Sequence, residues 1–299
     1  MIEIKNLTKK FGKTVALDNV SFSVPQGSIF GLVGSNGAGK STILRILSGV
    51  FAPDEGNAYL DEITPFENVK LKENIAFVSD YPYFLPASTL DSMAKYYKSI
   101  YSNWNEEKYE QLKTIFPIKS KQKISTMSKG MQRQSAIILS LSYMPKYILF
   151  DEIFDGLDPV VRELVKKILI EYVEETGATI VISSHNLREL EGFCDHIGFL
   201  HKGGILLQKD INSESLGVFR TQFVLGSDED FEKIKQNVNI LKETKQGKMI
   251  ELTVRGSETE FETLITSLNP VFYEILPLTL EELFISEMEV AGYDINNIF

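Results

Sequence analysis

Short apolar runs alternate with amphipathic stretches along the first two thirds of the chain. Five runs rich in apolar and β-branched residues predict strands, at residues 20–24, 28–34, 75–79, 147–151 and 179–184. Stretches that begin near residues 39, 128 and 159 have apolar residues at helical spacing and predict helices. Because strands and helices alternate, we expect an α/β fold with a mainly parallel sheet and helices on both faces.

The alternation is interrupted between the strands predicted at residues 75–79 and 147–151. Residues 90–100 and 106–115 carry helical spacing there, and no strong strand pattern accompanies them. We therefore expect a helical insertion over about residues 85–145 of the larger domain.

The last third of the chain follows a different order. Strands are predicted at residues 219–226, 239–244, 248–254 and 271–276, and helices at residues 228–238 and 257–268. This β-α-β-β-α-β order is typical of a small α+β, ferredoxin-like domain. We predict two domains, residues 1–214 and 215–299. A last helix is expected at Thr279, because Glu282 three residues later completes a capping-box pattern.

The composition is that of a packed soluble protein. Of the 299 residues, 43% are hydrophobic and 24% charged, which disfavours disorder, and Cys194, the single cysteine, cannot form an internal disulfide. No apolar run is long enough to span a membrane, and the first residues lack a secretory signal pattern, so we expect a cytoplasmic chain. The net charge is −10, and residues 213–299 carry 16 acidic against 7 basic side chains, which disfavours nucleic acid as a partner.

One segment has a specific chemical pattern. Residues 34–41 fit G-x-x-x-x-G-K-S/T, after an apolar strand and before a helix. Its glycines let backbone N–H groups approach phosphate oxygens, and the helix N-terminus favours an anion. The candidate nucleotide-binding residues are Gly34, Ser35, Asn36, Gly37, Ala38, Gly39, Lys40, Ser41 and Thr42. Lys40 would reach the outer phosphates and Ser41 would coordinate Mg²⁺, so the predicted ligand is a magnesium nucleoside triphosphate.

Two acids follow the strand at residues 147–151. Ligands of an open parallel sheet bind outside the carboxyl ends of its strands, so we expect Asp151 and Glu152 beside the phosphates. Asp151 suits the Mg²⁺ shell, and Glu152 suits a general base that polarises the attacking water. Alone, such a pair would more often lie in a solvated loop; the upstream phosphate loop favours the functional interpretation.

Together with further motifs, these residues resemble the ATP-binding-cassette (ABC) ATPases, and more closely the separate ATPase subunits of bacterial exporters. Phe11, in Lys-Phe-Gly, resembles the aromatic residue that stacks on adenine. Residues 127–131, Met-Ser-Lys-Gly-Met, resemble the family signature LSGGQ, of which Ser128 and Gly130 are retained. The alternatives are a buried aromatic at a strand end for Phe11 and a helix N-cap for Ser128.

Two more motifs extend the resemblance toward the end of the larger domain. Residues 155–159, Asp-Gly-Leu-Asp-Pro, resemble the D-loop, with Asp158 at the nucleotide. His185, after the strand at residues 179–184, resembles the switch histidine that senses the γ-phosphate. As alternatives, Asp158 would only start a helix and His185 would be structural.

The resemblance implies a mechanism and partners. Two ATPase subunits, identical or related, close head to tail, so that Ser128 of one faces the γ-phosphate held by the other. Lys40, Glu152 and His185 would be the catalytic residues, with ATP and Mg²⁺ bound. Separately encoded transmembrane permease subunits would be the other partners, which implies a peripheral location on the inner face of the membrane.

Three departures qualify the resemblance. Asp80 stands where the family has a glutamine that binds Mg²⁺; it is a candidate metal ligand, although its charge adds repulsion near the phosphates. Lys129 replaces the first glycine of the signature, and residues 153–154 are Ile-Phe instead of Pro-Thr. Lys40, Ser41, Asp151, Glu152 and His185 are retained, which favours hydrolysis. The C-terminal extension resembles those of exporters of peptide, antimicrobial or drug-like cargo. The alternative is an ATP-dependent dimerising clamp or regulatory ABC protein with little turnover. The second domain would be a dimer-contact or regulatory module.

Overall fold

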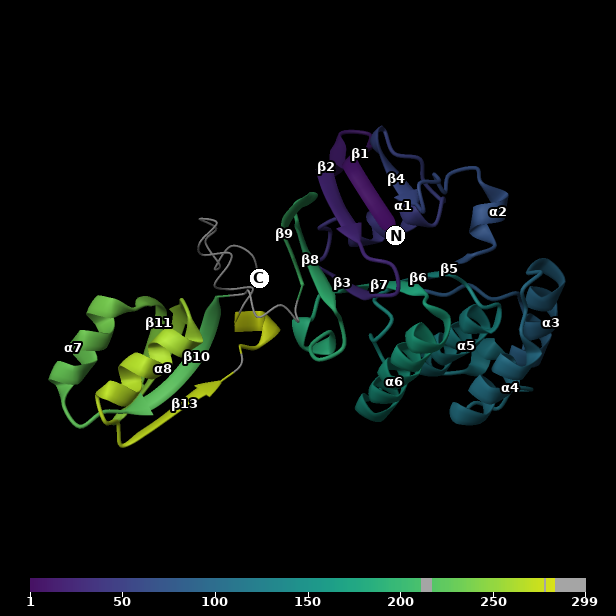
Figure 1. Cartoon of the computed structure of the whole chain (residues 1–299). Coiled ribbons are helices and arrows are strands. Elements are labelled where there is room, and N and C mark those ends of the chain that lie inside the picture. Colours follow the sequence, from purple (N-terminus) through teal and green to yellow (C-terminus); the bar gives the residue numbers. More distant parts are fainter. Residues whose placement is uncertain (211–216, 277, 283–299) are drawn as a thin grey trace. The chain divides into compact units, whose positions relative to one another are not determined.

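The chain forms two compact units, Met1–Ile211 and Asn212–Phe299 (Figure 1). The computed structural model describes residues 1–210, 217–276 and 278–282. The predicted domain boundary between residues 214 and 215 lies outside the described residues and stays a prediction. Each unit is described by itself below.

A six-stranded sheet forms the centre of the larger unit. Its strands, in spatial order, are β5 (Ile75–Val78), β6 (Tyr147–Asp151), β7 (Thr179–Ser184), β3 (Ile29–Val33), β8 (His196–His201) and β9 (Gly204–Asp210). All neighbouring pairs are parallel except β8 and β9. Every residue of β3, β6 and β7 is buried, which explains their continuous apolar runs. The mainly parallel sheet is thus confirmed, whereas β8 and β9 were not predicted.

Three further strands form a separate antiparallel sheet in the order β2 (Thr14–Val24), β1 (Ile2–Phe11) and β4 (Glu55–Leu60). The prediction that residues 20–24 belong to the parallel sheet is therefore wrong. The physical reason lies in their alternation: Val20, Phe22 and Val24 are buried, whereas Ser21 is exposed. Such a period of two is typical of an antiparallel sheet with one covered face.

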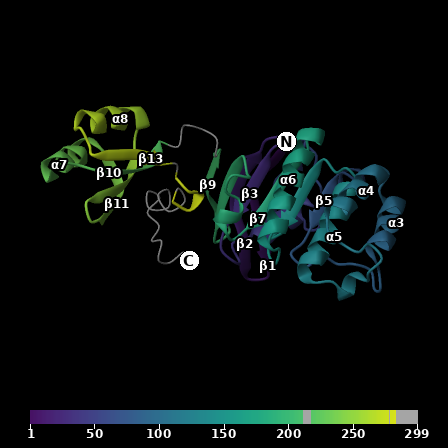
Figure 2. The same ribbon diagram turned by 90° about the horizontal axis from the view of Figure 1, so that it is seen from below.

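Helices cover the central sheet on both sides. In Figure 1, α1 (Lys40–Leu47) lies on the same side as the antiparallel sheet, and α6 (Pro159–Thr176) lies on the opposite side, which faces the viewer in Figure 2. Two short elements, α2 (Val69–Lys72) and the 3-10 helix η2 (Leu187–Glu189), complete the connections. The expectation of helices on both faces is confirmed, with the difference that α1 shares its side with a second sheet.

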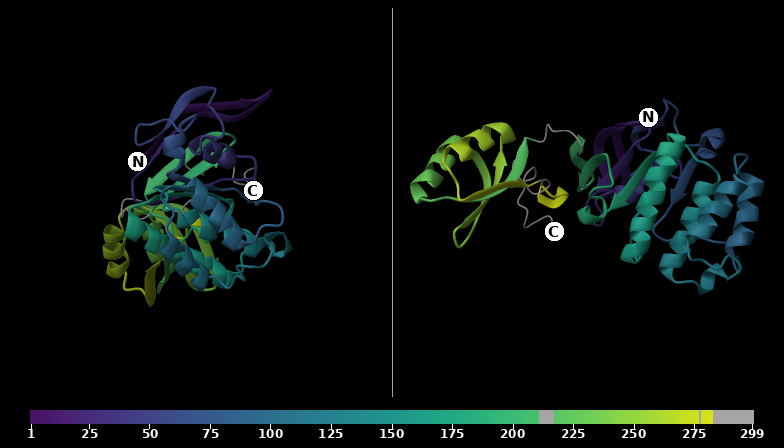
Figure 3. Two further views of the ribbon diagram at one scale, coloured as in Figure 1. Left: turned by 90° about the vertical axis from the view of Figure 1, so that its right-hand side faces the viewer. Right: turned by 60° about the horizontal axis from the view of Figure 1, so that its bottom comes forward.

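The predicted helical insertion is present as a group of three helices, which stand together in Figure 3. They are α3 (Leu90–Ile100), α4 (Glu106–Ile115) and α5 (Lys129–Ser142), with the 3-10 helix η1 (Ile124–Thr126) ahead of α5. The side chains of Thr89 and Asn105 accept hydrogen bonds from the first turns of α3 and α4. Both α3 and α4 pack against α5.

The smaller unit contains the element order predicted from its sequence. The elements are β10 (Val218–Val224), α7 (Asp228–Asn237), β11 (Asn239–Gln246), β12 (Met249–Arg255), α8 (Glu258–Ser267) and β13 (Phe272–Leu276). They form an antiparallel sheet in the order β11-β12-β10-β13. Phe219 and Phe223 of the sheet pack with Phe231 and Phe261 of the helices in one core. The capping box is also confirmed, because the backbone N–H groups of Thr279 and Glu282 each donate to the other residue's side chain.

None of the helices in the described part of the chain combines the length and the apolar character that crossing a bilayer requires.

Replacing Leu149 by alanine tests the central sheet as the main source of stability. Leu149 lies on β6 and is fully buried in the core that joins both sheets of the larger unit. We expect a loss of about 2–5 kcal/mol in the free energy of unfolding of this unit, measured by guanidinium denaturation, because a cavity replaces the side chain. Val69→Ala, at a residue that is 74% exposed, is the control and should change little. Equal effects of the two variants would contradict this assignment of the core.

Candidate functional site

The site lies where three neighbouring parallel strands end. Val33 of β3 pairs with Ser184 of β7, and Asp151 of β6 pairs with Ser183 of β7. The three strands therefore deliver the segments that follow them to the same edge of the sheet. These segments contain the phosphate loop, Glu152 and His185, which are far apart in sequence.

The loop at residues 34–39 leads into α1, whose first residue is Lys40. A Cβ atom at Gly34 would lie 2.3 Å from the Leu200 carbonyl oxygen, and one at Gly39 would lie 2.7 Å from that of Ala16. Gly37 and Gly39 have φ angles of 81° and 109°. Gly34 and Gly39 are thus required because the backbone of another segment lies close to them, and Gly37 and Gly39 because their φ angles are left-handed. Ser35, Asn36 and Gly37 are exposed, as an accessible anion-binding loop requires.

Lys40 joins this loop to the two other strand ends. Its side chain is only 5% exposed, and its Nζ donates to the carbonyl oxygen of Gly34 at 2.6 Å and lies 3.1 Å from Glu152 Oε1. Glu152 Oε2 in turn lies 2.8 Å from His185 Nδ1 and accepts from the His185 backbone N–H at 3.3 Å. The three predicted catalytic residues therefore form one chain of contacts.

The neighbour of Glu152 on β6 offers the features of a metal ligand. Asp151 is almost completely buried, and its Oδ1 accepts a hydrogen bond of 2.6 Å from the Ser183 hydroxyl. Its Oδ2 is buried without a hydrogen-bond partner among the described residues. Because buried polar atoms are normally satisfied, this carboxylate oxygen fits an oxygen-preferring cation or a water in its shell.

Ser183 and Asp155 were not singled out in the sequence. The Ser183 hydroxyl orders both acids, because it donates to Asp151 and accepts from the Glu152 backbone N–H at 3.0 Å. Asp155 places a carboxylate oxygen within 4.8 Å of ligand atoms of Glu152 and His185. Glu152 itself has a φ of 50°, which few non-glycine residues adopt and which is typical of functional sites. The available signal for Ser183 was a pair of serines at the end of an apolar strand.

Ser41 and Thr42 follow Lys40 in the first turn of α1, and both are partly exposed. Ala38 is buried at the end of the loop. The positions agree with a role beside a bound phosphate, but the Mg²⁺ role of Ser41 stays a prediction.

Asp80 is placed differently from the other predicted metal ligands. Its Oδ1 accepts from the Tyr81 backbone N–H at 3.0 Å, and its carbonyl oxygen accepts from Arg133 at 3.0 Å. It lines a cavity of about 240 Å³ that also holds Lys129 and Asp155. Among the described residues, no hydrogen bond or ion pair joins Asp80 to Ser41 or Asp151. Two of the departures from the family pattern, Asp80 and Lys129, thus share one cavity.

The signature and D-loop residues begin helices. Ser128 is the N-cap of α5 and accepts from the Met131 backbone N–H at 3.2 Å. Asp158 is the N-cap of α6 and accepts from Val161 at 3.0 Å. A Cβ at Gly130 would lie 2.8 Å from the Gly156 carbonyl oxygen, so the two segments touch. Both side chains thus act as helix caps, as the alternative interpretation expects. They also lie at helix N-termini, which favour bound anions.

Phe11 lies at the end of β1 and is 45% exposed. The alternative of a buried aromatic at a strand end is therefore wrong. An exposed ring that ends a strand is available for stacking on a ligand.

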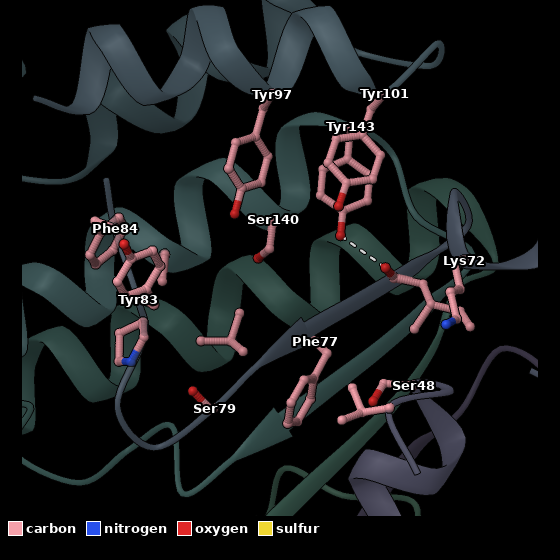
Figure 4. A pocket seen from close by; sticks show the side chains of 15 residues that line it. Ser48, Lys72, Phe77, Ser79, Tyr83, Phe84, Tyr97, Tyr101, Ser140 and Tyr143 are labelled. Carbon is pink, nitrogen blue, oxygen red and sulfur yellow. Dashed lines mark hydrogen bonds between the residues drawn. The ribbon is translucent and has the colours of Figure 1, made fainter. Parts of the chain in front are cut away.

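A second hollow, of about 390 Å³, lies between β5 and the insertion helices α3 and α5 (Figure 4). Tyr97, Tyr101 and Tyr143 point into it, and the rings of Tyr101 and Tyr143 stack with centroids 3.8 Å apart. The Tyr143 hydroxyl donates to the Ile75 carbonyl oxygen at 3.0 Å. Burial raises the pKa of Tyr97 to about 12.

Known proteins resemble the chain in sequence and in fold. The family model described as "ABC transporter" matches residues 17–155. The lantibiotic transport ATP-binding protein SrtF of Streptococcus pyogenes is 33% identical over 225 residues, which cover 72% of this chain and 94% of SrtF. The ABC transporter ATP-binding protein YtrB of Bacillus subtilis is 29% identical over 287 residues, covering 96% of this chain and 98% of YtrB.

Among solved structures, the dimeric ATP-binding cassette MJ0796, in a post-hydrolysis state with ADP and Pi, superposes with a TM-score of 0.65. Its sequence is 25% identical, and the match covers 71% of this chain and 100% of that cassette. Sequence relationship, sheet topology and the phosphate loop lead to the same conclusion. The chain belongs to the ABC transporter family, as an ATP-binding ATPase subunit.

Proposed function

We propose that the chain hydrolyses Mg·ATP at the edge of its central sheet and thereby drives a bacterial exporter. The contact chain Lys40–Glu152–His185 directly behind the phosphate loop carries this proposal. It combines a cation for the phosphates, a carboxylate for the water and an imidazole. The Glu152 carboxylate lies 3.1 Å from Lys40 Nζ and 2.8 Å from His185 Nδ1. The unsatisfied oxygen of Asp151 beside them supports the metal assignment.

The Lys40–Glu152 contact suggests how binding prepares the site. When a triphosphate enters the loop, Lys40 exchanges Glu152 for the outer phosphate oxygens, and Glu152 becomes free to accept a hydrogen bond from water. This water attacks the γ-phosphorus, the bond to the bridging oxygen breaks, and ADP and phosphate result. His185 supports the transferred phosphoryl group. Ser41 and Asp151, with Asp80 as a further candidate, would hold Mg²⁺, which would supply neutralising charge.

Two such subunits would bind ATP between them. Gly34, Lys40 and the rest of the loop hold the nucleotide in one subunit, while Ser128, Gly130 and Asp158 approach it from the other. The starts of α5 and α6 suit this role because helix N-termini stabilise anions. The dimeric MJ0796 cassette supports the arrangement.

The remaining partners would be transmembrane permease subunits on the inner face of the membrane. The hollow of Figure 4 is a suitable contact region, because Tyr83 at its rim is 79% exposed and aromatic residues around a concave surface are typical of protein contacts. Names of relatives such as SrtF and the bacitracin transport ATP-binding protein BcrA support peptide, antimicrobial or drug-like cargo. Residues 1–214 would form the ATP-binding domain, and residues 215–299 a dimer-contact or regulatory domain.

The alternative is an ATP-dependent clamp with little turnover. Asp80 and Lys129, which depart from the family pattern, line one cavity next to Asp155, and this cluster of changes favours the alternative. Retention of Lys40, Glu152 and His185 in contact favours hydrolysis instead.

Lys40→Ala should weaken Mg·ATP binding by about 10- to 100-fold, because a charged hydrogen-bond donor to the phosphates is lost. Isothermal titration calorimetry of the purified chain measures the affinity. Lys167→Ala is the matched control, since Lys167 lies on the exposed face of α6. Unchanged affinity in Lys40→Ala would refute the phosphate-loop assignment.

Glu152→Gln should lower the rate of phosphate release by about 100-fold or more and leave ATP binding intact, because the amide cannot act as a base. Steady-state release is compared with the wild type and with Glu171→Gln, an exposed glutamate on α6. Equal rates near zero in the wild type and in Glu152→Gln, even with membrane partners present, would establish the clamp instead of the motor.

Ser128→Asp should abolish ATP-driven dimerisation, because a carboxylate would face the γ-phosphate of the partner, while its oxygen can still cap α5. Ser128→Asn, which keeps the cap without the charge, is the control. Light scattering after gel filtration, in a Glu152→Gln background with Mg·ATP, measures the oligomeric state. If Ser128→Asp dimerises as well as its control, or if monomer binding of ATP falls, the head-to-tail arrangement is wrong.

A further inference from the structure

The segment directly after α1 contacts the end of β1. Phe51 follows the last residue of α1, Leu47, by one turn, and its backbone N–H donates to the Arg45 carbonyl oxygen at 3.1 Å. Its ring packs on the core of the larger unit and meets the ring of Phe11 edge to face, with centroids 5.4 Å apart and planes at 66°. Phe51 therefore connects the end of the phosphate-loop helix to the exposed aromatic of β1.

Asp54, three residues later, fixes the backbone ahead of Phe11. Its Oδ2 accepts from the Lys10 backbone N–H at 2.5 Å, and its own N–H donates to the Thr8 carbonyl oxygen at 2.9 Å. Its Oδ1 binds Lys9 Nζ at 3.0 Å, and this ammonium group stands 5.6 Å from the centroid of the Phe11 ring. The Phe11 ring thus has two neighbours, the Phe51 ring and the Lys9 ammonium group, although it is 45% exposed.

An exposed ring that is held in place is a favourable platform for a planar base. Base stacking on an aromatic side chain loses part of its free energy if the ring must first be ordered, so a neighbour that fixes the ring strengthens the contact. The same neighbour is anchored at the end of α1, whose other end presents the loop to the phosphates. One helix would then set the spacing between base and phosphates.

We propose that Phe51 is a positioning residue for the nucleotide base, which acts by holding the Phe11 ring. The proposal rests on the proposed function, because it requires the base to stack on Phe11. It predicts that Phe51 contributes to the binding of a nucleotide through the base and contributes nothing to the binding of the phosphates alone.

A purely structural role for Phe51 makes a different prediction. Phe51 and Phe66 line the same cavity of about 210 Å³ beside β4. The Phe51 ring also contacts the ring of Phe11. Loss of either ring would enlarge this cavity. Phe66→Ala is therefore a matched control that removes a phenylalanine ring from the same cavity without removing the Phe51–Phe11 contact.

The experiment measures the affinity of the full chain for two probes, Mg·ATP and magnesium tripolyphosphate, by calorimetry. Phe51→Ala should weaken ATP binding by about 2- to 10-fold, the contribution of one aromatic pair, and leave tripolyphosphate binding unchanged. Phe51→Tyr, which keeps the ring, should restore ATP binding, and Phe66→Ala should leave both affinities unchanged.

Two results would overturn the proposal. Equal losses for both probes in Phe51→Ala would show damage to the phosphate loop, and no loss for ATP would show that the base does not depend on Phe51. Phe11→Ala separates this failure from failure of the proposed function. If Phe11→Ala weakens ATP binding and Phe51→Ala does not, only the role of Phe51 fails. If Phe11→Ala has no effect while Lys40→Ala does, base stacking on Phe11 fails together with the proposal.

Discussion

The parallel pairing of β6, β7 and β3 is the constraint on which the site depends. Asp151 is level with Ser183, and Ser184 is level with Val33, so three segments from distant parts of the sequence begin at one edge of the sheet. A shift of one residue in either pair would reverse the side-chain directions at the strand ends and separate Glu152 from Lys40. The complete burial of the three strands fixes this register, because a shift of one residue would move every apolar side chain to the opposite face of the sheet.

The charges of Lys40 and Glu152 balance each other at that edge of the sheet. The nearly buried ammonium group of Lys40 requires an anion, and Glu152 supplies one at 3.1 Å. In the mechanism we propose, the glutamate is engaged until a triphosphate takes over the lysine, so that substrate binding and release of the proposed general base are one event. Ser183 maintains the geometry of both acids during this exchange through its two hydrogen bonds.

The chemistry-bearing motifs could be predicted from sequence because each lies within a few consecutive residues. The phosphate loop needs glycines where a Cβ would strike Leu200 or Ala16, and that requirement leaves a local pattern. Ser183 and Asp155 could not be assigned in this way, because their roles arise only from strand pairing and from the fold of the loop after β6. The second sheet was missed for a different reason: residues 20–24 carry the alternation of an antiparallel strand, but their partner strand β1 was not predicted.

The central claim is that Lys40 exchanges Glu152 for the phosphates of a bound nucleotide. A crystal structure of the chain with Mg²⁺ and a non-hydrolysable ATP analogue measures this directly. The account predicts that Lys40 Nζ contacts outer phosphate oxygens and that its 3.1 Å contact with Glu152 is broken. An analogue bound elsewhere, with the Lys40–Glu152 contact still in place, would contradict it.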